Sequence, residues 1–430
     1  MLTQIIDVLK NSPADAWEVT ETRTEGWEFY FIRHALDQNR VKNLEEYTVK
    51  VYRKSEDGTF LGSASGEIPP TADAAEIHRL VDQLLLAASL VKNPAYTLHS
   101  PADAAAEAAP GGAAFSLKGI SEAFLAALKG VQETETEDLN SVEIFVSGIR
   151  KHFVNSEGVD VRSEYPSSMV EAVVNARKDG HEIELYRMYT SGSCDADRLR
   201  QDLGEVLAFG KARLEASPTP ALGQADVVFS TDAALEIYSW YANRMNAAYK
   251  YMRYSDWEAG RPVAEADPEA DRVTLTAVPA LPNSSRNFAF DAEGAPIRET
   301  IQIRDNVAEA FLGSRQFSQY LGLSHSFQPS NWKVAGGREG AEKLRQGDFL
   351  EPVEFSDFQV NPLTGDIAGE IRLAFWHHDG QISPVTGGSV SGNMKAFAKS
   401  IRFSRETRQY DSREIPAVTR LKAVTITGAE

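Results

Sequence analysis

The sequence predicts an α+β protein in which an N-terminal sheet-and-helix region is followed by a β-rich C-terminal domain. Three patterns support this class. Residues 17–66 alternate apolar and polar side chains in short runs, as strands with one covered face do. Residues 71–90 instead repeat apolar side chains at helical spacing. From residue 272 onward, short apolar runs and glycine turns predominate, and few stretches are long enough for a helix.

Length and composition indicate more than one domain. The chain has 430 residues, which exceeds the size of an ordinary single domain. Residues 100–114 are rich in Ala, Pro, Gly and acidic residues, and Pro218 and Pro220 mark a second change along the chain. We therefore expect an N-terminal α/β domain at 1–98, a linker at 99–115, a middle α/β domain at 116–218 and a β-rich C-terminal domain at 219–430.

The N-terminal half is expected to mix helices with strands. A turn is predicted at 155–158 (Asn-Ser-Glu-Gly), because Asn and Gly tolerate positive φ. The predicted helices are 2–9, 71–90, 120–132 and 195–215. The predicted strands are 17–23, 27–33, 47–53, 59–66, 141–149, 152–155, 159–165, 169–177 and 182–190.

The C-terminal domain begins with a short apolar strand at 225–230 and a helix that extends to about Tyr249. Thr231 is expected to cap this helix. Aromatic residues at 238–257 lie on more than one helical face, which is typical of a buried core. Because tyrosine keeps a polar tip, the same stretch leaves room for a surface that binds another chain. Further helices are expected at 308–321 and 339–345.

The net charge of the chain disfavours nucleic acid as a partner. The formal net charge is −18, and an acidic surface repels phosphate backbones. The densest basic segment, 402–413, is interrupted by acidic residues, so we interpret it as a solvated surface. Direct nucleic-acid binding is therefore not expected.

The expected location is the cytoplasm. A single cysteine, Cys194, permits no disulfide within the chain, which fits a reducing compartment. Cys194 precedes a predicted helix, but no motif surrounds it and we expect a structural thiol. Residues 1–10 lack the apolar core of a secretion signal, and no stretch approaches the ~20 apolar residues of a membrane span.

The eight histidines provide no complete zinc motif. His181-Glu182 resembles the start of one, but no second ligand follows, and the alternating pattern predicts a strand whose neighbours face opposite ways. His377-His378 precedes Asp379-Gly380, which is typical of a hairpin turn, so both rings cannot easily bind one ion.

No other catalytic motif is found. The chain contains neither the Gly-Xaa-Ser-Xaa-Gly nucleophile elbow nor a phosphate-binding glycine loop. We therefore expect no catalytic residue and no metal ligand in this chain. The alternative is a site assembled from distant residues, such as His325 and His377 with an acid.

Five segments resemble, in order, segments of the TldD/PmbA family, once described as modulators of DNA gyrase and now regarded as peptidases. They extend the resemblance from about residue 15 to 428. The segments are Asn-Ser-Glu-Gly at 155–158, Asn-Phe-Ala-Phe-Asp-Ala-Glu-Gly-Ala-Pro at 287–296, Thr-Gly-Asp at 364–366, Val-Ser-Gly-Asn at 390–393, and Pro416 with the closing strand at 424–428.

The resemblance implies one of two branches. In the catalytic branch, TldD, a His-Glu-Xaa-Xaa-Xaa-His motif on the helix after the first strand of the C-terminal domain binds zinc together with a later Cys. The matching positions here are Tyr238, Ser239 and Asn243, and none is a usual zinc ligand. The chain contains no His between His181 and His325 and no Cys after Cys194. It therefore resembles the TldE or PmbA branch.

This branch implies a non-catalytic subunit of a zinc metallopeptidase complex. The zinc is expected in a TldD-like partner, and an unfolded peptide would be held as an added strand. A homodimer is a further possible assembly. Two alternative functions also remain: an active metallopeptidase with an unrecognised metal site, or a regulatory binding protein without proteolysis. The candidate peptide- or partner-facing residues are Tyr238, Tyr241, Asn243, Asp291 and Asn393.

Overall fold

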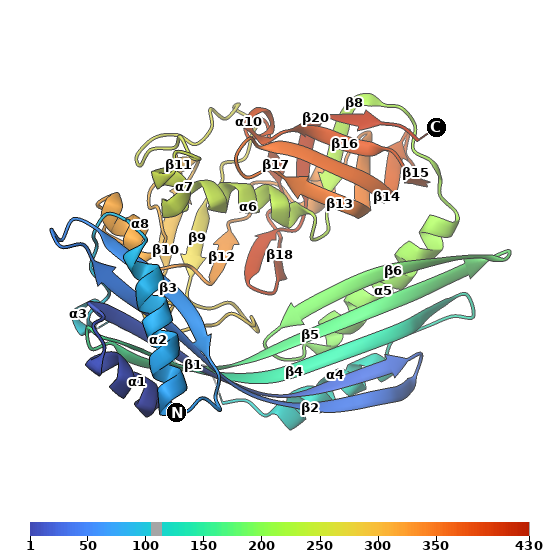
Figure 1. The fold of residues 1–430 in the computed structure, drawn as a ribbon. Helices are drawn as coiled ribbons and strands as arrows, with labels where there is room; N and C mark the ends of the chain where they lie inside the picture. The colour runs from blue at the N-terminus through green and yellow to red at the C-terminus, as the bar shows by residue number, and fades with distance from the viewer. Residues whose placement is uncertain (105–113, 430) are drawn as a thin grey trace.

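The computed structural model describes residues 1–104 and 114–429 and confirms the α+β class (Figure 1). Its strands form three sheets. One belongs to the N-terminal half, and two belong to the β-rich C-terminal domain. Most of the predicted linker, at 105–113, lies outside the described residues. Among the described residues, no helix has the length and apolar character needed to span a bilayer.

The N-terminal sheet has six antiparallel strands in the order β3-β2-β1-β4-β5-β6. The strands are β1 Ala16–Ile32, β2 Ala35–Lys54, β3 Leu61–Ile68, β4 Glu137–Asn155, β5 Asp160–Lys178 and β6 His181–Ser191. Several predicted short strands are therefore parts of longer ones. Gly26 lies between the predicted strands 17–23 and 27–33, but it pairs with both Lys42 and Ser147, and a Cβ there would meet the Val146 carbonyl at 2.7 Å. Glycine thus keeps β1 continuous.

This sheet runs through both segments predicted as separate N-terminal and middle domains. β1 pairs with β4 from Glu18–Asn155 to Ile32–Ser141. The boundary placed at 99–115 therefore falls between strands that share a sheet. The physical reason is that such pairing satisfies the backbone groups that two smaller sheets would leave as open edges.

Helices cover this sheet in two groups. The helices α1 Leu2–Asn11 and α2 Ala74–Ser89 pack on β1–β3 around Ile5, Val49 and Ile77. The helices α4 Leu117–Lys129 and α5 Ala196–Leu214 pack on β4–β6 around Ile144 and Leu203. Both groups bury an apolar stripe, as amphipathic helices do. The short helix α3 spans Pro101–Ala104.

The C-terminal domain contains the sheets β11-β10-β9-β12-β19-β18 and β13-β8-β20-β16-β14-β15-β7, with β17 beside β20. Figure 1 shows it placed over the N-terminal sheet. Its strands are β7 Ser217–Pro218, β8 Gly223–Phe229, β9 Leu275–Val278, β10 Thr300–Arg304, β11 Val307–Ala308, β12 Asn331–Val334, β13 Phe349–Val360, β14 Asp366–His378, β15 Gln381–Thr386, β16 Ser389–Asn393, β17 Arg402–Phe403, β18 Thr407–Tyr410, β19 Arg413–Pro416 and β20 Thr419–Thr427. Its helices are α6 Ala234–Arg244, α7 Ala247–Tyr251, α8 Arg315–Tyr320, α9 Ala341–Leu344 and α10 Met394–Phe397.

The helix predicted from Thr231 to Tyr249 is two helices. α6 has Ala233 rather than Thr231 at its N-cap, and the Thr231 hydroxyl has no hydrogen-bond partner. The chain breaks at Asn246, whose Oδ1 accepts the Ala248 N–H at 2.8 Å and caps α7. The helix predicted at 308–321 is likewise shortened to α8, because residues 307–308 belong to a strand.

Candidate functional site

A cleft of about 900 Å3 lies between the N-terminal sheet and the C-terminal domain. One wall is formed by β4, β5, β6 and α5, and includes Tyr165 and Tyr189. The other is formed by the start of α6, the segment 282–288 and the β18–β19 hairpin, and includes Asp232 and Tyr410. Its lining mixes aromatic and charged side chains and includes neither His nor Cys.

Ion pairs join the two walls. Asp202 on α5 accepts from Arg198 Nε at 2.8 Å and from Arg408 Nη2 at 2.9 Å, and Arg408 also contacts Glu205 at 3.1 Å. Asp202 is buried, which raises the pKa of its carboxyl despite the two arginines. This cluster connects α5 to β18, so it positions the walls and offers no free base.

A second ion pair joins the N-terminal sheet to the C-terminal domain at Arg187, which lines the cleft. Arg187 on β6 binds both carboxylate oxygens of the buried Glu354 on β13, with Nη1 2.9 Å from Oε2. Burial raises the pKa of Glu354 to about 7, although the charge of Arg187 opposes this shift. The N-terminal sheet is thereby tied to the C-terminal domain by a charge-assisted contact.

A smaller pocket of about 290 Å3 adjoins the cleft and shares Lys151, Arg286 and Phe288 with it. Asp291 also lines this pocket. Its Oδ1 accepts the N–H groups of Glu293 (2.9 Å) and Ala295 (3.0 Å), and its Oδ2 accepts that of Gln328 at 2.8 Å. Burial raises the pKa of Asp291 to about 7.

The turn that begins at Asp291 requires glycine. Gly294 has φ 77°, and a Cβ there would lie 2.7 Å from the ring of Phe153 on β4. Asp291 and Gly294 together let the segment 291–295 press against the N-terminal sheet. Asp291 is therefore a turn-forming residue as well as part of the pocket wall.

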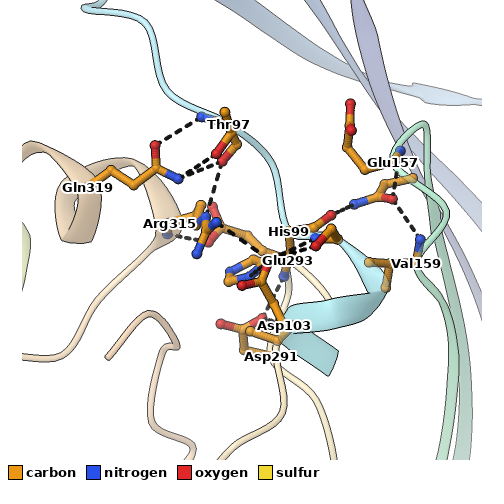
Figure 2. Close-up of polar contacts among 12 residues, drawn as sticks. Thr97, His99, Asp103, Glu157, Val159, Asp291, Glu293, Arg315 and Gln319 are labelled. Carbon is orange, nitrogen blue, oxygen red and sulfur yellow. Dashed lines mark hydrogen bonds and ion pairs between the residues drawn. The ribbon is translucent and has the colours of Figure 1, made fainter. Parts of the chain in front are cut away.

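Polar contacts fasten this turn to the segment that follows α2, as Figure 2 shows. Arg315 donates its backbone N–H to Glu293 Oε2 at 2.7 Å and its Nε to the Thr97 carbonyl at 3.2 Å. His99 is 3% exposed and its two ring nitrogens have no hydrogen-bond partner. Burial lowers the pKa of His99 to about 4, so its ring is neutral at pH 7.

Two of the five candidate residues are fully buried and can face neither a peptide nor a partner, which corrects that expectation. Tyr238 and Tyr241 are 0% exposed and lie in the core of the C-terminal domain. Tyr238 shares a hydrogen bond of 2.8 Å with Thr419, and Tyr241 packs on Trp240 and Trp257. The helix carries aromatic residues on several faces because both C-terminal sheets pack around it.

The other three candidates are separated from one another. Asn243 is half-buried and lines neither cavity. Asn393 donates its amide to the Thr364 carbonyl (3.1 Å) and to Asp366 Oδ1 (2.7 Å), and thereby joins two of the sequence motifs. Of the five residues, only Asp291 lines one of the two cavities.

The residues on α6 do not fit a zinc site. The positions matched to the zinc motif hold Tyr238, Ser239 and Asn243, which provide neither imidazole, thiolate nor carboxylate. In the described part of the chain, one group of three metal-binding residue types lies within reach of a common ion, and it is exposed: Asp348, His378 and Asp379.

The predicted hairpin at His377–Gly380 is confirmed between β14 and β15. The two rings take different partners, as expected for strand neighbours. His378 Nδ1 lies 2.7 Å from Asp348, while His377 stacks on Phe349 with its Nε2 3.2 Å from Glu351. Among the described residues, neither His325 nor His377 belongs to a group of three such residues, so the structure offers no support there for the alternative site built from them.

The single thiol behaves as a structural group. Cys194 is half-buried directly before the N-cap of α5. Burial, assisted by the charge of Asp195, raises the pKa of its thiol to about 11. A reactive cysteine requires the opposite shift.

Sequence reasoning missed the residues that build the cleft. Lys151, Arg187 and Arg286 belong to no motif, and the partners of Arg187 and Arg408 lie more than 160 residues away along the chain. One signal was available for Lys151: the alternation within β4 and β5 places Lys151 and Tyr165 on the face opposite the one that the helices cover.

The PmbA/TldA metallopeptidase C-terminal domain family matches residues 222–428. An uncharacterized protein of Methanocaldococcus jannaschii is 21% identical over 277 residues, which are 59% of this chain and 63% of that protein. The match thus spans less than two thirds of that relative's length.

Three solved structures share the fold. TldE from Thermococcus kodakarensis has a TM-score of 0.76 at 14% identity, with 100% of both chains covered. A proposed modulator of a DNA gyrase from Thermotoga maritima has a TM-score of 0.74 at 14% identity, with 99% of both covered. A second proposed gyrase modulator, from Bacteroides thetaiotaomicron, has a TM-score of 0.76 at 17% identity, with 100% of this chain and 98% of that one covered.

Proposed function

The chain belongs to the TldD/PmbA family, and within it we propose that the protein is a non-catalytic subunit of a zinc metallopeptidase complex. In this role it would shape the chamber in which an unfolded peptide is held. A TldD-like partner would bind the zinc and supply the chemistry of peptide cleavage. The similarity in fold to a protein named TldE supports this assignment.

One observation carries the proposal. The α6 positions that match the zinc motif hold Tyr238, Ser239 and Asn243, and Tyr238 is fully buried with its hydroxyl bonded to Thr419. A zinc site needs His, Cys or carboxylate donors that reach an open coordination position. Here the Tyr238 side chain of α6 packs in the hydrophobic core instead of reaching a metal. This arrangement is compatible with catalysis by another chain.

The cleft supports the peptide-binding part of the proposal. Its volume of about 900 Å3 lies within the ordinary range of ligand sites, and its lining combines tyrosines with polar groups. Its acidic residues Asp202 and Glu205 are engaged in ion pairs with Arg408. The cleft is therefore suited to holding a ligand, with no free carboxylate at these positions to act as a base.

The test is reconstitution. The chain is purified alone and then mixed with a relative from the same genome that carries the His-Glu-Xaa-Xaa-Xaa-His motif. We expect a stable complex that contains zinc and cleaves an unfolded peptide, whereas this chain alone has no zinc and no activity. A partner variant with the motif Glu changed to Ala is the control and should form the complex without cleavage. Stoichiometric zinc with proteolysis by this chain alone would contradict the proposal.

A further inference from the structure

We propose that the smaller pocket binds the C-terminal carboxylate of a peptide whose preceding residues lie in the adjoining cleft. We call it the cationic pocket, defined by Lys151, Arg286, Phe288 and Phe290. This inference rests on the proposed peptide-binding function. It adds an anchoring site and a preference for one end of the peptide.

The two cations come from both sides of the cleft. Lys151 lies on β4, where it pairs with Ser163 of β5, which also lines the pocket. Arg286 belongs to the C-terminal domain. Lys151 Nζ lies 5.6 Å and the Arg286 guanidinium carbon 5.8 Å from the centroid of the Phe288 ring. The aromatic ring therefore holds two positive charges at the same pocket.

These cations have no anionic partner in the described structure. No carboxylate oxygen of the described residues lies within 4.0 Å of the Lys151 or Arg286 side-chain nitrogens. The chain has 62 acidic and 44 basic residues, so acidic groups are not scarce. The acids Asp160 and Glu164 lie on the other face of β5, where they pair with His152 and Arg150.

The remaining electrostatics also favour an added anion. Burial and the charge of Arg286 lower the pKa of Lys151, and a bound anion would oppose this second effect. Asp291 is the single carboxylate in the lining, and its oxygens accept three backbone N–H groups. The lining therefore carries two cations, Lys151 and Arg286, against one internally satisfied acid.

The shape of the site selects a peptide end over a free anion. The cationic pocket and the cleft share Lys151, Arg286 and Phe288, so a ligand anchored in one continues into the other. The rings of Phe288 and Phe290 provide an apolar surface for the last side chain of the peptide. A planar carboxylate suits a guanidinium, which can donate two parallel hydrogen bonds. Inorganic phosphate would use the cations alone.

The experiment compares one peptide in two forms. An N-terminally labelled, unstructured hexapeptide with a C-terminal Phe is titrated against the full chain by fluorescence anisotropy, once as the free acid and once as the amide. We expect the free acid to bind about tenfold more tightly, the size of one charge-assisted hydrogen bond. Arg286→Gln and Lys151→Gln should each remove most of this preference and leave binding of the amide unchanged.

Matched controls separate the pocket from general charge effects. Arg261→Gln and Lys92→Gln change exposed cations that line neither cavity, and they should leave the preference intact. Thermal unfolding by circular dichroism verifies that each variant is folded. Inorganic phosphate is the third probe and should compete with the free acid only at much higher concentration.

Equal binding of acid and amide would overturn the inference, as would an unchanged preference in both pocket variants. Phosphate binding without peptide binding would also overturn it, because the pocket would then serve a free anion. None of these outcomes affects the proposed subunit function, which depends on zinc content and on activity with the partner.

Discussion

The side-chain amide of Asn155 donates a hydrogen bond of 2.8 Å to the backbone carbonyl of His99. Its Oδ1 accepts the N–H groups of Glu157 at 3.0 Å and Val159 at 2.9 Å, as Figure 2 shows. One buried asparagine thus closes the β4–β5 turn and attaches it to the segment that follows α2. The sequence motif at 155–158 therefore has a structural role beyond the turn itself.

We predict that Asn155→Ala lowers the free energy of unfolding by about 3 kcal/mol, because three hydrogen bonds are lost and the His99 carbonyl is left buried. Urea unfolding followed by circular dichroism measures this change. Glu157→Ala, in the same turn but exposed, is the control and should cost less than about 0.5 kcal/mol. Similar losses for both variants would contradict the role assigned to Asn155.

Glu18 should make stability depend on pH. This carboxyl is 7% exposed and accepts a hydrogen bond from Tyr52 at 2.8 Å. Burial raises its pKa from 4.5 to about 7. Between these values the unfolded chain has lost the proton that the folded chain retains, so stability falls as pH rises from 4.5 to 7.

Glu18→Gln should remove this contribution, because glutamine is neutral at every pH. Urea unfolding at pH 4.5, 6 and 7.5 should show that the wild type loses up to about 3 kcal/mol relative to the variant. Glu56→Gln changes an exposed residue and is the control, so its free energy of unfolding should change with pH as that of the wild type does. A constant difference between wild type and Glu18→Gln at all three pH values would refute the prediction.

The Arg187–Glu354 ion pair should contribute most to the stability of the fold above neutral pH. Arg187→Met leaves Glu354 buried without its guanidinium, which raises the pKa of Glu354 further above 7. At pH 5 the carboxyl is protonated and the loss should be about 1 kcal/mol. At pH 8 the carboxyl group must either ionise inside the protein or keep its proton, and both cost free energy. The loss of unfolding free energy should therefore reach about 3 kcal/mol.

Urea unfolding at both pH values measures this difference. The double variant Arg187→Met with Glu354→Gln removes the titrating group and should lose equal stability at pH 5 and pH 8. If the single variant is equally destabilised at both pH values, burial of the Glu354 charge is not the cause.

Cys194 should react slowly with alkylating reagents. A thiol whose pKa is about 11 rather than 9 holds about 100-fold less thiolate at pH 7.5. Iodoacetamide labelling followed by intact-mass spectrometry should therefore proceed far more slowly in the folded chain than in the same chain unfolded in urea. Equal rates would show that the thiol is accessible and unperturbed.

Local patterns predicted much of the secondary structure. The turn at 155–158 and the hairpin at His377–Gly380 depend on residues that tolerate positive φ, so a few neighbours suffice to predict them. The patterns failed where distant pairing decides. Polar residues at 21, 23 and 25 interrupt the apolar alternation, but pairing on both sides keeps β1 whole. The aromatic spacing of Tyr238 and Tyr241 fitted both a buried core and a binding surface, and only the two C-terminal sheets that enclose them decide for the core.

The sequence by itself determined which chemistry α6 can offer, because Tyr238, Ser239 and Asn243 lack zinc-binding donors whatever the fold around them. Only the tertiary structure decided which charges are paired. Arg187 meets Glu354 across 167 positions, whereas Lys151 and Arg286 meet at one aromatic ring without a carboxylate partner among the described residues. Electrostatic interaction depends on distance in space and on burial, and neither quantity can be obtained from the order of residues along the chain.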